Sequence, residues 1–239
     1  MINQSITLAN GETLHFQLEH RQRRTIGLKI TAEGLIVHAP KQIADWQLQK
    51  ILQDKSHWII KKLTAHNTQQ VPKIQWKNGE NLFYLGNEII LDVQFSRIQK
   101  AIVFEHNRLI VALPDMDNAA IIRRKILQWF KKQAMGDFAR RLEILSAKLG
   151  VTTPPLTLSN AKSRWGSCNS HGEIRLNWRL IQAPPQMIQY VICHELAHLK
   201  EMNHSSKFWA VVAQLFPTYK LVEKELKQWS LRLHAIDSE

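Results

Sequence analysis

The chain has 239 residues, of which 44% are hydrophobic and 22% charged, so it is long enough to form one large or two small domains. Its net charge of +12 exceeds what solubility needs and favours acidic partners such as nucleic acid, nucleotides or anionic protein tails. No apolar run approaches the roughly 20 residues of a membrane span, and the two cysteines are too few for a disulfide scaffold.

The first residues are polar and lack the apolar core of a secretion signal. Together with the cysteine count, this leads us to expect a cytoplasmic protein with no membrane partner. The basic side chains are spread along predicted amphipathic helices. A solvated helix face is therefore the competing explanation for the positive charge.

Two hairpins are predicted at the start of the chain, followed by a helix. Their apolar runs are residues 6–8, 14–18, 26–30 and 35–38. The first pair flanks Asn10-Gly11 and the second flanks Glu33-Gly34, and glycine favours such tight turns. The basic connection at residues 21–24 is expected to be a charged loop, with phosphate binding as the alternative. After Pro40, apolar residues between 43 and 65 recur at close to helical spacing.

A second group of strands is predicted before Pro114. Its apolar runs are residues 82–85, 88–95, 101–104 and 109–113. Pro114-Asp115 ends this part of the sequence. We therefore expect a β-rich N-terminal region with one helix over residues 1–115 and a second domain over residues 116–239. The alternative is that the first half packs on the second instead of folding alone.

A long helix is predicted after Asp117 or Asn118, either of which could cap it, and it should stop at Gly150. Its apolar and aromatic residues recur at helical spacing, so we expect them to lie in the core. Residues 156–158 then predict a short strand. Residues 173–178 alternate in polarity as a half-buried strand does.

The strongest chemical signal is His194-Glu195-Leu196-Ala197-His198. Residues 184–193 before it suit an apolar helix that is entered through proline. Positions four apart share one helix face, so His194 and His198 can hold one metal ion. Glu195 is then placed to take a proton from metal-bound water. A chance match on a surface helix is the alternative, and the apolar character of the helix argues against it.

A zinc site that keeps one position open for water needs a third protein ligand, and His204 is the candidate. It follows ten positions after His194, and a straight helix would carry it roughly 15 Å along the axis. The chain must therefore break and turn back after His198.

The sequence offers residues for such a break. Asn203 tolerates the left-handed conformation that ends helices, and Ser205 or Ser206 could cap a new helix. A last amphipathic helix is predicted over residues 219–233. It carries Glu223 and Glu225, which are the alternative third ligands, but His204 is closer and lies at the break.

These motifs resemble the YgjP-like metallopeptidase family, which is related to the SprT and minigluzincin groups. The resemblance rests on residues 163–168, 194–198, 203–205 and 208–209, and on Arg24-Thr25-Ile26, Gly34, Ala39-Pro40 and Trp58-Ile59 in the N-terminal half. It implies an α+β, zincin-like domain, with helices packed on a small mixed sheet. It also implies that Zn²⁺ is held by His194, His198 and His204, with Glu195 as the general base.

In zincins an extended substrate aligns with an edge strand beside the zinc helix, and the hairpin over residues 163–178 is the candidate for that strand. Arg164 would then be a fixed cation near the metal. We expect it to stabilise an oxyanion or to hold a carboxylate or phosphate. Its alternative role is structural, as an arginine stacked on Trp165.

The function that we expect is zinc-dependent hydrolysis, with a peptide or protein as the first choice of substrate. One alternative is a metal-dependent hydrolase of nucleotides. The positive charge with Arg164 and Lys162 supports it, and the absence of a Gly-rich phosphate loop counts against it. Another is a SprT-like, nucleic-acid-associated protease. A purely structural metal site is disfavoured because Glu195 is present. Cobalt or nickel could occupy the same imidazoles.

Overall fold

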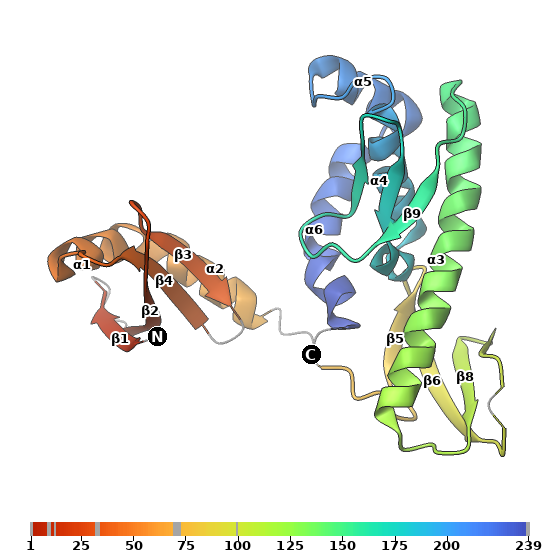
Figure 1. Ribbon diagram of the computed structural model, residues 1–239, viewed down its shortest axis with the longest axis horizontal. Coiled ribbons are helices and arrows are strands. Elements are labelled where there is room, and N and C mark those ends of the chain that lie inside the picture. The colour runs from red at the N-terminus through yellow and green to blue at the C-terminus, as the bar shows by residue number, and fades with distance from the viewer. Residues whose placement is uncertain are drawn as a thin grey trace. The chain divides into compact units, whose positions relative to one another are not determined.

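The computed structural model describes residues 2–8, 11, 13–31, 34–68, 73–98 and 100–237 (Figure 1). The chain divides into two compact units, unit 1 (Met1–Gln70) and unit 2 (Val71–Glu239). We expected the boundary near Asp115, where the β-rich sequence ends. The structure divides the chain earlier, because the apolar residues of the second group of strands share one core with the helices that follow.

Unit 1 is a four-stranded sheet with two helices. Its elements are β1 (Ile2–Thr7), β2 (Thr13–Arg21), β3 (Gly27–Thr31), β4 (Gly34–Pro40), α1 (Asp45–Asp54) and α2 (Ser56–Thr68). Alternate residues of β2 and β4 are buried with Leu48, Leu52 and Ile59 of the helices. Both predicted hairpins are confirmed, although Asn10 and Glu33 lie outside the described residues. The single predicted helix is two helices, because the backbone leaves the helical path at Lys55 (φ −98°, ψ 2°).

Unit 2 begins with a second four-stranded sheet, formed by β5 (Asn81–Tyr84), β6 (Asn87–Phe95), β7 (Val103–Glu105) and β8 (Arg108–Leu113). Its strand order, β5-β6-β8-β7, is the order β1-β2-β4-β3 of unit 1. In both sheets the outer pairs are antiparallel and the central pair is parallel. The sheets of the two units therefore have one topology.

The correspondence between the sheets extends to individual residues. Phe16 lies opposite Leu35 in unit 1 and Leu91 lies opposite Leu109 in unit 2, and all four side chains are buried. A proline closes the last strand of each sheet, at Pro40 and just after β8, and in each unit a helix begins five residues after it. The chain thus contains an internal repeat, which we did not predict from the sequence.

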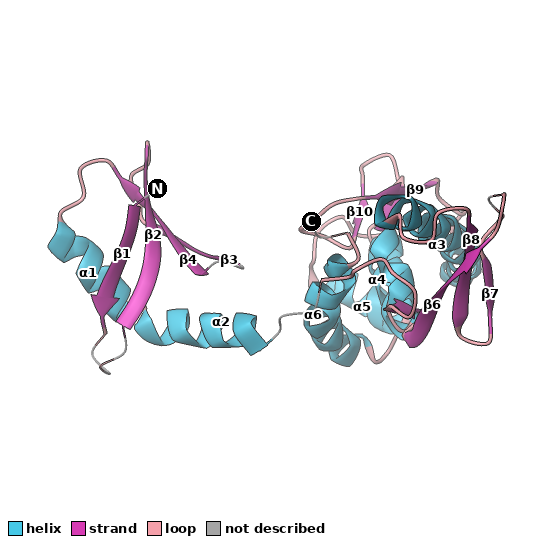
Figure 2. Cartoon of the chain, turned by 90° about the horizontal axis from the view of Figure 1, so that it is seen from below, coloured by secondary structure: helices cyan, strands magenta, loops and turns pink. Residues whose placement is uncertain are grey.

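The rest of unit 2 is a set of helices packed on a small mixed sheet (Figures 1 and 2). Its elements are α3 (Ala119–Leu149), β9 (Leu156–Ser159), β10 (Gly166–Cys168), β11 (Ile174–Asn177), η1 (Trp178–Gln182), α4 (Pro185–Ala197), α5 (Ser206–Leu215) and α6 (Tyr219–Ala235). The sheet order is β10-β11-β9, so β10 is an edge strand. Helix α4 contacts α3, α5, α6 and β10. This arrangement confirms the predicted α+β, zincin-like fold class.

The repeated sheet of unit 2 also fixes the start of α4. Leu85 and Gly86, in the turn after β5, donate backbone hydrogen bonds to the carbonyls of Ile181 and Gln182, at 2.8 and 3.0 Å. Gly86 has a φ of +83°, and a Cβ there would lie 2.8 Å from the Cα of Pro184. Only glycine allows this approach, so the sheet lies directly against the N-terminus of α4.

The long helix α3 begins and ends as its sequence predicts. Asn118 caps it, because its side-chain oxygen accepts a hydrogen bond of 3.1 Å from the backbone N–H of Ile121. Gly150 ends it in the left-handed conformation, with a φ of 68°. Among the helices that the structure describes, none is long and apolar enough to cross a membrane.

The cap of α3 gives a test of the fold. Asn118→Ala removes the acceptor for the Ile121 N–H and should lower the free energy of unfolding by about 1 kcal/mol. Urea denaturation followed by circular dichroism measures this change. Asn118→Ser keeps a capping oxygen and is the matched control. If Asn118→Ala unfolds at the same urea concentration as the wild type, the cap does not stabilise α3.

Candidate metal centre

Helix α4 carries the His-Glu-x-x-His motif into the protein interior. Pro185 stands in its first turn, where the missing N–H removes no helical hydrogen bond. Nine of its thirteen residues are buried, Glu195 among them. His194 and His198, one turn apart, are half-buried on one side of the helix. The motif is therefore part of a core helix, and the alternative of a chance match on a surface helix does not hold.

The chain turns back after α4, as the predicted ligand set requires. The helix ends at Ala197, and the backbone N–H groups of Leu199 and Lys200 donate to the carbonyls of Leu196 and Ala197, at 3.0 Å each. These short-range bonds close the turn that brings the following loop back toward His194.

The loop after this turn differs in one detail from our expectation. Asn203 does not adopt a left-handed conformation. Its side-chain oxygen instead accepts a hydrogen bond of 3.0 Å from the backbone N–H of Ser205, as in an Asx turn. Ser205 then caps α5 by accepting from the N–H of Phe208 at 3.4 Å. The side chain of Asn203, and not its backbone conformation, shapes this turn.

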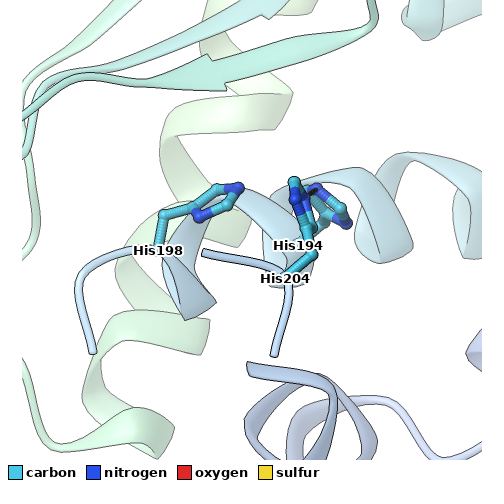
Figure 3. A group of neighbouring side chains, drawn as sticks. All are labelled: His194, His198 and His204. Carbon is cyan, nitrogen blue, oxygen red and sulfur yellow. Dashed lines mark hydrogen bonds between the residues drawn. The ribbon is translucent and has the colours of Figure 1, made fainter. Parts of the chain in front are cut away.

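The turn places His204 beside the two histidines of α4 (Figure 3). The Nε2 atoms of His204 and His194 lie 3.1 Å apart. One ring nitrogen from each of His194, His198 and His204 can be chosen so that all three lie within 4.8 Å of one another. The Nδ1 of His198 lies 3.3 Å from the carbonyl oxygen of Glu201. A hydrogen bond there would leave its Nε2 free to bind a metal.

The histidines have the chemistry that a divalent transition metal needs. Burial, reinforced by His198 and His204, lowers the pKa of His194 to about 4, and burial also lowers the pKa of His198. Both imidazoles are therefore neutral at physiological pH, the form that binds a cation. The Nδ1 of His194 is buried and has no hydrogen-bond partner among the described residues. Three convergent imidazoles fit zinc, although the set also suits cobalt or nickel.

Glu195 lies next to this cluster and is only 5% exposed. Burial raises the pKa of its carboxyl group to about 8, and the positive charge of Arg164 partly opposes the shift. The backbone of β10 lies against this carboxylate, because a Cβ added at Gly166 would clash with Oε1 of Glu195. Gly166 therefore leaves the space that the Glu195 side chain occupies.

A pocket of about 230 Å³ opens beside Glu195 and His194. Its lining includes Arg164, so the structure brings this predicted residue to the site. Trp165 does not stack on Arg164. It stacks on His234, with ring centroids 4.8 Å apart. The guanidinium of Arg164 has no ion pair with any described residue. Lys162, which we also expected near the site, does not line the pocket.

Two further charged groups, Glu223 and Lys227, line the pocket. Glu223, which we considered as a third metal ligand, forms an ion pair of 2.8 Å with Lys227 and is not part of the histidine cluster. Tyr190 also lines the pocket, and we did not single it out. It lies four residues before His194, so the spacing that pairs His194 with His198 could have identified it.

The chain is similar to known proteins over its motif-bearing region. A sequence model described as YgjP-like, metallopeptidase domain, matches residues 24–229. A UTP pyrophosphatase of Escherichia coli (strain K12) is 32% identical over 88 residues, which are 36% of this chain and 53% of that protein. The chain thus matches about half the length of this relative.

Two solved metallopeptidase zymogens share a partial structural likeness with the chain. Abylysin of Pyrococcus abyssi is 28% identical with a TM-score of 0.35, and the match covers 37% of this chain and 90% of that structure. Jannalysin of Methanocaldococcus jannaschii is 20% identical with a TM-score of 0.35, over 38% of this chain and 94% of that structure.

The predicted ligand set can be tested by metal content. Elemental analysis of the purified protein should find about one zinc per chain in the wild type and in Glu195→Gln, because Glu195 is not among the predicted ligands. His204→Ala should lose most of the metal, since only His194 and His198 would remain. Full metal retention by His204→Ala would contradict the ligand set and would direct attention to Glu223.

Proposed function

The chain belongs to the YgjP-like metallopeptidase family, and from this membership and the site geometry we propose that it is a zinc-dependent hydrolase whose first class of substrate is peptide bonds. The observation that carries the proposal is a buried carboxylate, Glu195, beside three convergent imidazoles. We include a cytoplasmic location in this proposal.

His194, His198 and His204 would hold the metal, which would lower the pKa of a water molecule and polarise the bond to be cleaved. Glu195 would accept the proton that this water loses and pass it to the leaving amine. Its pKa of about 8 reflects burial, and the charges of Arg164 and of a bound metal oppose that shift. The carboxyl group can therefore act as both base and acid near neutral pH.

Arg164 and the edge strand β10 suit an extended peptide. Gly166–Cys168 pairs with β11 along one side only and lies beside α4, so its other side can accept a substrate backbone. Arg164 lines the adjoining pocket, where its guanidinium would stabilise the negative charge that develops on the attacked carbonyl oxygen. These features favour peptide hydrolysis.

Hydrolysis of a nucleotide phosphoanhydride is the second candidate. The curated relative is a UTP pyrophosphatase, and the pocket contains two cations, Arg164 and Lys227, that could bind phosphate oxygens. The first candidate needs the edge of β10, whereas the second needs these two cations. A nucleic-acid-associated protease, the third possibility, would require a binding surface outside this pocket.

The general-base role is tested by Glu195→Gln after zinc reconstitution. With casein and UTP assayed in parallel, the substrate that the wild type turns over should be cleaved at least ~100-fold more slowly by the variant, because the base is lost while the metal ligands remain. Turnover of casein supports the peptidase and turnover of UTP supports the second candidate. Unchanged turnover in Glu195→Gln would exclude Glu195 as the base.

The contact between β10 and the carboxylate gives an independent test. Gly166→Ala adds a methyl group at the position of the Glu195 side chain and should displace it, so turnover should fall ~10-fold or more while the zinc content stays at wild-type level. Gly136→Ala is the matched control, because nothing lies within 4 Å of a Cβ at this exposed position of α3. Wild-type activity in Gly166→Ala would show that this clearance does not position the base.

A further inference from the structure

A groove on unit 1, far from the histidines in the sequence, has the features of a second binding site. It has a volume of about 520 Å³. It lies between α1, the residues just before β3 and the residues at and just after the end of β4. We call it the α1 groove. The lining residues that matter here are Arg24, Gln42, Ile43, Trp46, Gln47 and Lys50. Trp46 is the most unusual of them, because this large apolar residue is 65% exposed.

The internal repeat shows that the fold does not require a large side chain at the position of Trp46. Leu48 and Leu52 of α1 correspond to Ile122 and Ile126 of α3, since each pair is buried against its own sheet. In the same register, the residue of unit 2 that corresponds to Trp46 is Ala120. A repeat unit thus folds with alanine at this position, so the exposed Trp46 is not explained by the core of unit 1.

Two further apolar residues of the groove, Ile43 and Ile51, also differ from their counterparts in unit 2. In the register set by the buried residues, Ile43 corresponds to Asp117 and Ile51 corresponds to Lys125. At these two positions the copy in unit 2 is polar where the copy in unit 1 is apolar. Ile43 and Ile51 are half-buried, and Ile43 packs against the core of unit 1, so the two side chains form an apolar wall beside the exposed Trp46. A hollow with apolar walls and a few polar groups is suited to binding.

The charges of the groove select the kind of ligand. Arg24 and Lys50 are exposed, and neither forms an ion pair with a described residue. The groove lining contains no carboxylate. Gln42 and Gln47 add amide groups that can donate and accept hydrogen bonds. The groove thus combines two unpaired cations, two amides and one exposed aromatic ring.

We propose that the α1 groove binds single-stranded nucleic acid. Trp46 would stack on a base, Arg24 and Lys50 would contact the phosphates on either side, and the two glutamines would reach base edges or sugar hydroxyls. An acidic peptide could use the same cations, but it has no need of an exposed indole as a stacking platform. The net charge of +12 would draw a polyanion to the protein.

The binding test uses the full-length protein and a fluorescein-labelled deoxythymidine oligonucleotide of about 16 nucleotides. Fluorescence anisotropy should show binding by the wild type, weakened about fivefold or more in Trp46→Ala through loss of stacking. In Arg24→Ala/Lys50→Ala, the slope of log affinity against log salt concentration should become shallower by about 1.4, since two phosphate contacts are lost.

The matched control is Trp58→Ala/Lys62→Ala, which removes an exposed tryptophan and an exposed lysine of unit 1 that do not line the groove. This control and Glu195→Gln should bind as the wild type does. Binding that survives Trp46→Ala, or a wild type that does not bind the oligonucleotide, overturns the proposal. The proposal is also overturned if the protein binds the duplex with a deoxyadenosine strand more tightly than the single strand. The same holds if a labelled glutamate-rich peptide, and not the oligonucleotide, binds in a way that depends on Trp46. Because catalysis is not measured, failure here leaves the hydrolase proposal intact.

Discussion

The burial of α4 is the constraint on which the candidate site depends. The helix holds two imidazoles and a carboxylate among apolar side chains, and this burial is the largest cause that lowers the pKa of His194 and raises that of Glu195. Leaving a buried polar atom such as Nδ1 of His194 without a partner costs about 1–3 kcal/mol. The apolar packing of α3, α5 and α6 around α4 offsets such costs.

The two copies of the repeated sheet differ in what surrounds them. In unit 2 the sheet contacts the start of α4, through the hydrogen bonds of Leu85 and Gly86 and the approach of Gly86 to Pro184. It thereby supports the helix that carries the histidines. In unit 1 the helix that follows the sheet is α1, the counterpart of α3, and it presents Trp46 to solvent. One topology thus supports the proposed active site in one copy and, in our proposal, forms a binding surface in the other.

Local patterns in the sequence predicted which histidines come together, because the three lie on one helix and in the turn after it. The shared face of His194 and His198, the need for a turn before His204 and a cap at Ser205 or Ser206 follow from helix geometry and capping chemistry. Long-range packing was not predictable in this way. The boundary expected at Asp115 followed a change in local pattern, whereas the structure divides the chain according to which core the strands join. The parallel pairing of β2 with β4 likewise joins separate hairpins.

The central claim is that His194, His198 and His204 form one metal centre with Glu195 outside it. The most direct measurement is a crystal structure of the zinc-loaded protein with anomalous diffraction data collected at the zinc absorption edge. We predict a single anomalous peak about 2.0–2.1 Å from one nitrogen of each histidine, with the Glu195 carboxylate unbound to the metal. A peak coordinated by Glu223 in place of His204, or no peak at the three imidazoles, would contradict the account.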